Sequence, residues 1–399
     1  NCISQTPLSL IDIYISERGV WEMQFKCPKD VLMPSINTVQ RAVQTSSSID
    51  IYTGIYLSAS EGQLTMIGTN IDLSIKTTIA VDVIEEGKVV VEGKLFSDIV
   101  RKWPADKPIN VALDVNTNNI TISDGNDNSS FKAEIKTMNV NDYPSFPDPN
   151  PEIEAGEAKL WDIPQQDLKK VITSTAFSAA KADHSRIYLT AILLESKNNE
   201  LRAVATDTHR LAYYKLPGHD GNISAMITAE DLLDISKLLA DNDEMIRLTL
   251  TPRRAFFDIT NTTIVTRLIE GTFPPYEKVI PTQHRTIVKI GRQELIDAVD
   301  RIAVMIRNAS TFMVKMTIKD NYMSIASGEL EIGKAEEKIY VEQEGEDLII
   351  KMDYRFLFEG LKSLIGEVVE IQFNGSESAI LFQSEEMPGF IYIMMPLIV

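Results

Sequence analysis

The sequence predicts an α+β protein made of three related modules, each with two helices and antiparallel strands. Three observations lead to this class. Two kinds of helix-like segment alternate along the chain at a regular offset, and strand–turn–strand segments lie between them. The chain also has 399 residues with 44% hydrophobic content, more than one core usually holds.

The first kind of helix is predicted by apolar residues at spacings of three and four, with an acidic residue in the first turn. It begins near Lys29 ("KDVLMPSINTVQRAVQ"), Pro164 ("PQQDLKKVITSTAFSA") and Gly291 ("GRQELIDAVDRIAVMI"). The second kind follows each of these after about 61 to 64 residues, as "EGKLFSDIVRKWP", "TAEDLLDISKLLAD" and "MDYRFLFEGLKSLI". Such a constant offset indicates duplicated units.

Strand pairs are predicted in each module by "GIYLSASEGQLTMIGTN", "AILLESKNNELRAVATD" and "KMTIKDNYMSIASGE". Proline clusters at 141–157 and 271–283 predict linkers, because proline disfavours helix interiors and central strands. The predicted domains are therefore 23–149, 150–279 and 280–399. Residues 1–22 are expected to be an extension, with the native chain beginning at Met23.

Composition excludes some classes of protein. The chain has no run of about 18 apolar residues, so no membrane helix is expected. Cys2 and Cys27 are too few for a disulfide framework, which fits a reducing cytoplasm and two unreactive bystanders.

The net charge of -18 argues against a protein that grips nucleic acid over its whole surface. The six helical segments, however, carry +2 between them, which leaves -20 on the strands and loops. This distribution predicts a weakly basic helical face within an acidic body, although helices also accept Lys and Arg readily for other reasons.

The segment "AVATDTHRLAYYKL" places Asp207, His209 and Arg210 in the middle of a predicted buried strand pair. Such groups need partners or a function, which leaves a catalytic site, a metal site or a binding corner. The four histidines form no helical two-His motif, and neither a paired-Cys motif nor a nucleophile elbow accompanies them. Asp207 is expected to cap a turn or pair with Arg210, and a hydrolase using Asp207 and His209 remains one alternative.

At this point "ATDTHRLA", "FPPYEKVIP", "YLTAILLE" and the terminal "YIMMPLIV" together resemble the bacterial sliding clamp family, the beta subunits of DNA polymerase III. The resemblance runs from Met23 to Val399. It implies the DNA clamp fold, in which two chains form a ring-shaped head-to-tail homodimer around duplex DNA, without sequence specificity. It also implies a processivity factor with no catalysis, no cofactor and no metal. A structural repeat protein that does not bind DNA is the other alternative.

The implied partners are the DNA polymerase III alpha subunit, the clamp loader, and other polymerases and repair proteins. In the family these partners carry a Gln followed by an aliphatic-aromatic pair. Carried over by position, the receiving pocket uses Arg186, Tyr188, Leu189, Thr206, Thr208, His209, Arg210, Leu211, Pro274, Val279, Asp353, Phe356, Ile393, Met395, Pro396 and Leu397. Thr208 stands where the family has a glycine.

Two further surfaces follow from the same resemblance. Candidates for the DNA-facing lining are Arg101, Lys102, Lys169, Lys170 and Lys181. Candidates for the dimer interface are Phe131, Val304 and Met305. A weakly basic lining attracts phosphates without holding them, which permits sliding.

Overall fold

The protein is described here by a computed structural model, which covers residues 21–114, 116–125, 131–182, 184–307, 312–328 and 333–398. The chain forms two compact units. Unit 1 contains the chain up to residue 158 together with 246–267, and unit 2 contains 159–245 together with 268–399. The predicted second domain, 150–279, therefore contributes to both units. Residues 1–20 of the predicted extension lie outside the described residues.

Unit 1 is built on one antiparallel sheet with the strand order β15-β16-β17-β4-β3-β2-β6-β9-β8-β7-β1-β5. Its strands are β1 (Trp21–Cys27), β2 (Gly54–Ser60), β3 (Gln63–Thr69), β4 (Leu73–Ala80), β5 (Asp82–Glu85), β6 (Gly87–Glu92), β7 (Ile109–Asp114), β8 (Asn119–Ser123), β9 (Ala133–Met138), β15 (Met245–Leu250), β16 (Arg254–Ile259) and β17 (Thr262–Arg267). Its helices are α2 (Lys29–Gln40), α3 (Gly93–Lys102) and α4 (Asn150–Glu154).

Unit 2 holds a sheet of order β14-β11-β12-β13-β26-β25-β24-β18-β22 and a smaller one of order β21-β20-β19-β23. Its strands are β10 (Lys159–Pro164), β11 (Ala191–Lys197), β12 (Glu200–Thr206), β13 (Arg210–Pro217), β14 (Ser224–Thr228), β18 (Thr286–Gly291), β19 (Met313–Lys319), β20 (Tyr322–Ala326), β21 (Glu336–Tyr340), β22 (Glu342–Gly345), β23 (Leu348–Asp353), β24 (Val368–Phe373), β25 (Ile380–Gln383) and β26 (Phe390–Met394). Its helices are α5 (Gln165–Thr175), α6 (Ala229–Ser236), α7 (Arg292–Ile306) and α8 (Tyr354–Ser363).

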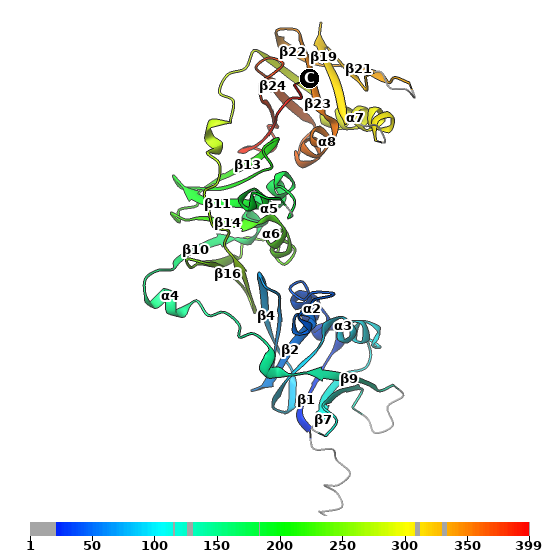
Figure 1. Ribbon diagram of the computed structural model, residues 1–399, viewed down its shortest axis with the longest axis vertical. Helices are drawn as coiled ribbons and strands as arrows, with labels where there is room; N and C mark the ends of the chain where they lie inside the picture. The colour runs from blue at the N-terminus through cyan, green and yellow to red at the C-terminus, as the bar shows by residue number, and fades with distance from the viewer. Residues whose placement is uncertain are drawn as a thin grey trace, which may run out of the picture. The chain divides into compact units, whose positions relative to one another are not determined.

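The helices pack in three pairs, α2 with α3, α5 with α6 and α7 with α8, as the repeat predicts (Figure 1). All six predicted helical segments are helices, and Pro34 lies inside α2. The three predicted strand pairs are also confirmed, as β2–β3, β11–β12 and β19–β20. The threefold organisation read from the sequence is thus present in the local architecture.

Helix α3 shows why these segments fold as they do. Its buried residues Gly93, Phe96, Ser97 and Val100 follow the three-and-four spacing of one helix face. The Glu92 side chain caps the first turn by accepting from the backbone N–H of Lys94, at 3.3 Å, and of Leu95. Basic residues end the helix, where its dipole favours positive charge.

The two predicted linkers are more ordered than their prolines indicate. The first contains the short helix α4. The second places the Phe273 and Tyr276 side chains in a buried cluster, 9% and 7% exposed. Proline content predicted the break in regular structure correctly, but it carried no information about packing of the linker onto the sheet.

Cys27 is buried in β1. Burial, with a smaller contribution from the charge of Asp30, raises the pKa of its thiol to about 11. The thiolate is therefore scarce at neutral pH, in agreement with the expected bystander role. Cys2 lies outside the described residues.

Candidate functional site

Residues 207–210, which we call the Asp207 corner, join β12 to β13 in unit 2. The Asp207 Oδ1 atom accepts from the backbone N–H of His209 and of Arg210, both at 3.0 Å. Its Oδ2 atom accepts from Arg210 Nε at 3.0 Å. Asp207 is therefore occupied as a turn cap and an ion-pair partner, as the sequence predicted, and its carboxylate is not poised for catalysis.

No group of three or more His, Cys, Asp or Glu side chains that could hold a metal occurs in the described part of the chain. Both carboxylate oxygens of Asp207 already accept hydrogen bonds from His209 and Arg210. The hydrolase alternative, which needed Asp207 and His209 to act on water, has no support in this geometry.

Arg210 is the most constrained charge of the corner, with 10% of its side chain exposed. Its guanidinium lies 4.6 Å from the ring centre of Phe356 and 5.6 Å from that of Phe177. It also pairs with Glu359 on α8. Burial opposes the charged form, but the hydrogen bond to Glu359 and nearby negative groups raise the pKa of Arg210 overall. Arg210 thereby ties β13 to α8.

The C-terminal segment is held directly against this corner. Strand β26 pairs with β13, with Leu211 opposite Ile393. Beyond the strand, the backbone N–H of Met395 donates to the His209 carbonyl at 2.8 Å, and that of Leu397 donates to the Lys351 carbonyl at 2.8 Å. The tail predicted to reach the pocket therefore lies beside His209.

Helix α8 reaches the same place by close packing on β26. Gly360 faces Tyr392, where an added Cβ would come within 2.1 Å of the ring. The Tyr392 hydroxyl donates to the Phe356 carbonyl at 2.9 Å. The Phe356 ring is thus positioned to stack on the His209 ring, with ring centres 6.2 Å apart and planes at 18°.

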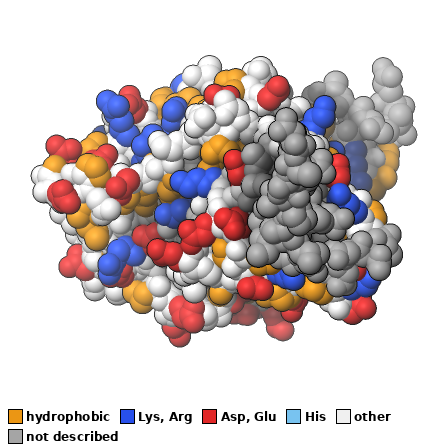
Figure 2. Space-filling model, turned by 90° about the horizontal axis from the view of Figure 1, so that it is seen from below, with side chains coloured by type: hydrophobic (Ala, Val, Ile, Leu, Met, Phe, Trp, Pro, Cys, Tyr) orange, Lys and Arg blue, Asp and Glu red, His pale blue; other side chains and the backbone are white. Residues whose placement is uncertain are grey.

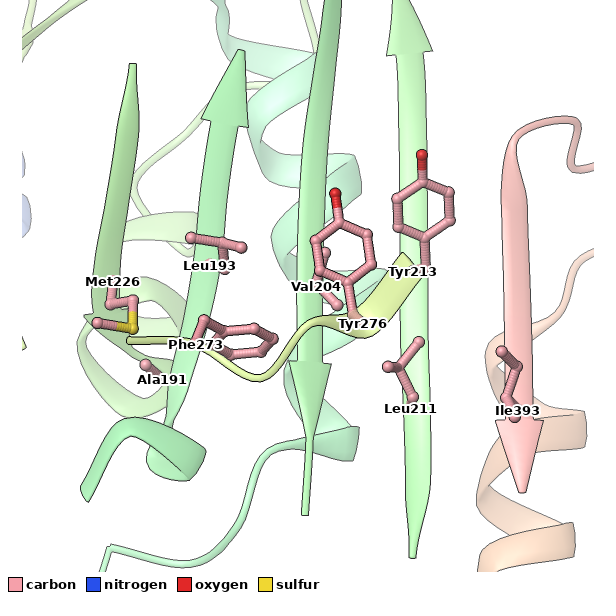
Figure 3. Close-up of a cluster of buried hydrophobic side chains, with 9 residues drawn as sticks. All are labelled: Ala191, Leu193, Val204, Leu211, Tyr213, Met226, Phe273, Tyr276 and Ile393. Carbon is pink, nitrogen blue, oxygen red and sulfur yellow. The ribbon is translucent and has the colours of Figure 1, made fainter. Parts of the chain in front are cut away.

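An apolar cluster lies beside the corner and contains Leu211, Ile393, Phe273, Tyr276 and the residues drawn with them in Figure 3. Leu211 and Ile393 project from neighbouring strands, and the two aromatic side chains come from the linker that crosses the sheet (Figure 3). Tyr188 packs against its edge and is partly buried.

Exposed apolar side chains continue beyond this cluster. Val279 is 52% exposed, Met395 43% and Leu397 39%. Val279 follows Tyr276 in the linker and Met395 follows β26, so both continue segments that carry members of the cluster. Exposed apolar side chains beside a concave or packed site are typical of peptide binding.

The linker is held over the sheet by a polar network. The Tyr276 hydroxyl donates to Glu195, and its ring stacks on that of Tyr213 at 5.7 Å. Arg202 contacts Glu277 at 3.0 Å and Glu200 at 2.7 Å. Burial is the main cause that raises the pKa of Tyr276, and it raises the pKa of Tyr213 to about 12. Both phenols therefore stay protonated and able to donate.

Several predicted pocket residues have other local roles. Leu189 is fully buried and Pro396 is buried, whereas Arg186 is exposed and Pro274 half-buried. Asp353 caps α8 through the Arg355 N–H at 2.9 Å and pairs with the Arg355 side chain at 2.7 Å.

Thr206 and Thr208 belong to the backbone of the corner. The Thr206 hydroxyl donates to the Arg210 carbonyl at 2.6 Å and accepts from the Thr208 N–H at 3.1 Å. Thr208 has φ of 81°, an unfavourable angle for a β-branched residue.

Sequence reasoning missed Phe177 and Glu359, the partners of Arg210. No local signal marks them, because Phe177 follows α5 and Glu359 occupies an exposed helix position. Tyr276 was within a quoted motif, but its position predicted a linker residue and not a buried one.

Four of the five basic candidates for a lining lie on α3 and α5, and Lys181 lies in the segment that follows α5. Arg101 pairs with Asp98 at 2.7 Å and Lys169 with Asp241 at 2.8 Å. Lys170 lies 5.4 Å from the Tyr214 ring centre, and Lys102 and Lys181 are exposed. On the face drawn in Figure 2, acidic and basic side chains are interspersed. The ion pairs of Arg101 and Lys169 partly neutralise the positive charge of these two candidates.

The three dimer candidates are accessible to different degrees. Phe131 is 54% exposed and meets the Trp103 ring edge to face, with ring centres 5.7 Å apart. Val304 is 65% exposed, and Met305 next to it is half-buried near the end of α7.

Comparison with known proteins gives a consistent result over most of the chain. Residues 23–147 match the N-terminal domain of the DNA polymerase III beta subunit, 162–275 match its central domain and 277–398 its C-terminal domain. The chain belongs to the DNA polymerase III beta subunit family. It is accordingly a sliding clamp, a processivity factor in DNA replication and not a catalyst.

Individual relatives agree with this assignment. The beta sliding clamp of Bacillus subtilis is 29% identical over 390 residues, which cover 94% of this chain and 99% of the relative. The crystal structure of the DNA polymerase sliding clamp from Bacillus subtilis has a TM-score of 0.86 at 27% identity and covers 95% of this chain and 100% of its own. The Thermotoga maritima beta subunit structure has a TM-score of 0.85 at 25% identity, with 94% and 100% covered. None of the described helices has the length and apolar character needed to cross a membrane.

Proposed function

We propose that the surface around Leu211, Ile393, Val279 and Met395 receives the short peptides by which replication and repair proteins bind this clamp. The observation that carries the proposal is the hydrogen bond from Met395 N–H to the His209 carbonyl, at 2.8 Å, because it seats the tail beside the apolar cluster. Each apolar anchor that the peptide buries contributes about 1.5–3 kcal/mol. The adaptable Met395 suits a site with several partners.

The proposed partners are the DNA polymerase III alpha subunit, the clamp loader, and other polymerases and repair proteins with such peptides. Because these partners act on the chromosome, we place the protein in the cytoplasm. His209 and Arg210 supply the polar groups beside the apolar surface that contact the polar groups of a bound peptide. Phe356 contacts both side chains and holds them in place.

Binding of a fluorescein-labelled peptide with a Gln followed by an aliphatic-aromatic pair tests this site. Met395→Asp, at a position 43% exposed, and removal of residues 395–399 are each expected to weaken binding at least about 100-fold, the equivalent of two anchors. The matched control is Ile84→Asp, because Ile84 on β5 of unit 1 is 47% exposed, similar to Met395, and the substitution introduces the same charge away from the site. Unchanged binding by both site variants would disprove the assignment.

The ring and its lining require a topological test. We propose that two chains close head to tail around duplex DNA, with Phe131 of one chain near Val304 and Met305 of the other, and Arg101, Lys102, Lys169, Lys170 and Lys181 facing the hole. Exposed Phe131 and Val304 support the contact, since large apolar side chains gain by being covered.

Two measurements separate this proposal from the alternative of a structural repeat protein without DNA. Light scattering is expected to give a dimer at micromolar concentration, and Val304→Asp is expected to shift it toward monomer. The loaded protein is expected to stay on nicked circular duplex DNA and to dissociate when that DNA is linearised. Exchanging Lys102, Lys170 and Lys181 for Gln should shorten retention without abolishing it, because topology supplies most of the hold.

A further inference from the structure

Unit 1 contains a second corner with the geometry of the Asp207 corner. Residues 70–73, the Asn70 corner, join β3 to β4 as residues 207–210 join β12 to β13. The Asn70 Oδ1 atom accepts from the N–H of Asp72 at 2.9 Å and of Leu73 at 2.8 Å. Asp207 makes the same two bonds to residues two and three positions further on.

The strand beside each corner is also equivalent. In unit 1, β17 pairs with β4 and places Val265 opposite Ser74, as β26 places Ile393 opposite Leu211. Arg267 N–H donates to the Asp72 carbonyl at 3.2 Å. Met395 makes the corresponding bond to His209 in unit 2. Arg267 therefore occupies the position of Met395.

A proline-containing linker packs on the second strand of each corner at the equivalent position. The Lys76 ammonium lies 4.8 Å from the Phe146 ring centre. The matching pair in unit 2 is Tyr213 with Tyr276, at 5.7 Å. Corner, neighbouring strand and linker are thus repeated together, so the sequence repeat extends to the surroundings of the proposed peptide site.

The chemistry of the Asn70 corner is different. It opens on a cavity of about 180 Å³, lined by polar groups that include Tyr52, Ser74, Ser145, Arg254 and Arg267. Arg254 and Arg267 are direct cross-strand partners on β16 and β17. Like charges at such a position repel unless an anion lies between them. The cavity is smaller than the roughly 300–1,000 Å³ typical of small-molecule pockets, so it suits side chains of a peptide.

The two guanidinium groups are weakly neutralised within the protein. Among the described residues, Arg254 forms no ion pair. Arg267 lies 3.7 Å from the Asp72 carboxylate, and both side chains are more than half exposed. In a chain of net charge -18, the two arginines that line one cavity can donate to carboxylate groups in a bidentate manner.

We propose that the Asn70 corner is a second docking site, which takes an acidic segment of a partner protein with a carboxylate between Arg254 and Arg267. This second site is distinct from the peptide site of unit 2. The Asn70 corner recognises its ligand by charge, whereas Leu211 and Met395 select apolar side chains. One clamp chain then has two corners with the same backbone arrangement, one that binds acidic side chains and one that binds apolar side chains.

The test uses the full chain and a fluorescein-labelled tetraglutamate peptide at low ionic strength, followed by anisotropy. The double variant Arg254→Gln/Arg267→Gln is expected to weaken binding at least tenfold. Ser145→Glu, which adds a competing carboxylate at the cavity, is expected to do the same. The matched control, Arg253→Gln/Lys88→Gln, removes the same two charges from exposed positions outside the cavity and should bind as the wild type does.

Two further arms identify the ligand class. A single-stranded oligonucleotide of equal charge should bind the wild type no better than it binds the double variant. If the oligonucleotide instead binds more tightly than tetraglutamate and needs the two arginines, the peptide proposal is replaced by a nucleic-acid site. Tetraglutamate binding that ignores both cavity variants, or falls equally in the control, overturns the proposal. Removal of residues 395–399 should leave tetraglutamate binding intact while abolishing binding of the motif peptide, so the two sites fail independently.

Discussion

The Asp207 corner and the Asn70 corner share a backbone and differ in what they present. Both use an Asx turn and a neighbouring strand whose backbone N–H donates to a carbonyl of the turn. In both, a linker side chain packs on the strand that follows the turn. In unit 2 the side chains are Leu211 and Met395, whereas in unit 1 they are Ser74 and Arg267. Backbone hydrogen bonds therefore preserve the shape of a duplicated site, while a few side chains decide what it binds.

The largest expected difference between the corners is in stability on truncation. Leu211 is 4% exposed, so Leu211→Ala should cost about 2–5 kcal/mol by leaving a cavity. At the matching position, Ser74→Ala removes the 2.6 Å hydroxyl contact with Thr69 and should cost only about 1 kcal/mol. Urea unfolding monitored by circular dichroism measures both. Equal costs would mean that the two corners are equally packed.

The next contrast concerns charge. Arg210→Met removes a mostly buried guanidinium from Asp207 and Glu359 and should cost about 2–3 kcal/mol, below the full buried-pair value because Glu359 is half exposed. Leu73, which takes the place of Arg210 in unit 1, should tolerate Leu73→Met at less than about 1.5 kcal/mol. Thermal unfolding of the two variants ranks them, and the reverse order would contradict a structural role for Arg210.

A smaller effect of opposite sign is expected from the turn backbone. Thr208 has φ of 81°, so Thr208→Gly should stabilise the protein by up to about 1 kcal/mol through relief of strain. Ile71 at the matching position is outside the left-handed region, and Ile71→Gly should destabilise by a similar amount. A loss of stability in both variants would show that Thr208 is not strained.

The smallest contrast lies in the response of the linkers to acid. Hydrogen bonds from Lys197 and then from Arg202 lower the pKa of Glu277. Because the folded pKa of Glu277 is lowered, ionised Glu277 stabilises the folded linker. This stabilisation is complete above the unfolded pKa of about 4.3 and is lost as the pH falls through the folded pKa.

The unit 1 linker is held differently, by the Tyr143 hydroxyl donating to the Ile67 carbonyl at 2.8 Å. Hydrogen exchange corrected for intrinsic rates should therefore increase at 273–280 as the pH falls below about 4.3, and remain steady at 143–147. Parallel changes in the two linkers would remove Glu277 as the cause.

Much of the architecture followed from the sequence, because local rules govern it. Apolar spacing located all six paired helices and the three strand pairs, and the offset between helices exposed the repeat. The role of Asp207 was also predictable, since an aspartate before a strand commonly caps its own turn. These properties depend on residues close together in the chain.

The surroundings of the site did not follow from the sequence. The stacking of Phe356 on His209, the pairing of Glu359 with Arg210 and the close contact of Gly360 with Tyr392 join residues far apart in the chain. No periodicity reports such pairs, because they arise only when β13, β26 and α8 pack together.

The sequence by itself determined the class, the threefold repeat and the turn chemistry, since each rests on propensity and hydrogen bonding within a few residues. Only the tertiary structure decided that Arg254 and Arg267 face one cavity across a strand pair, and that Met395 lies beside His209. Long-range pairing of strands brought these side chains together, and the register of that pairing is a property of the whole packed sheet.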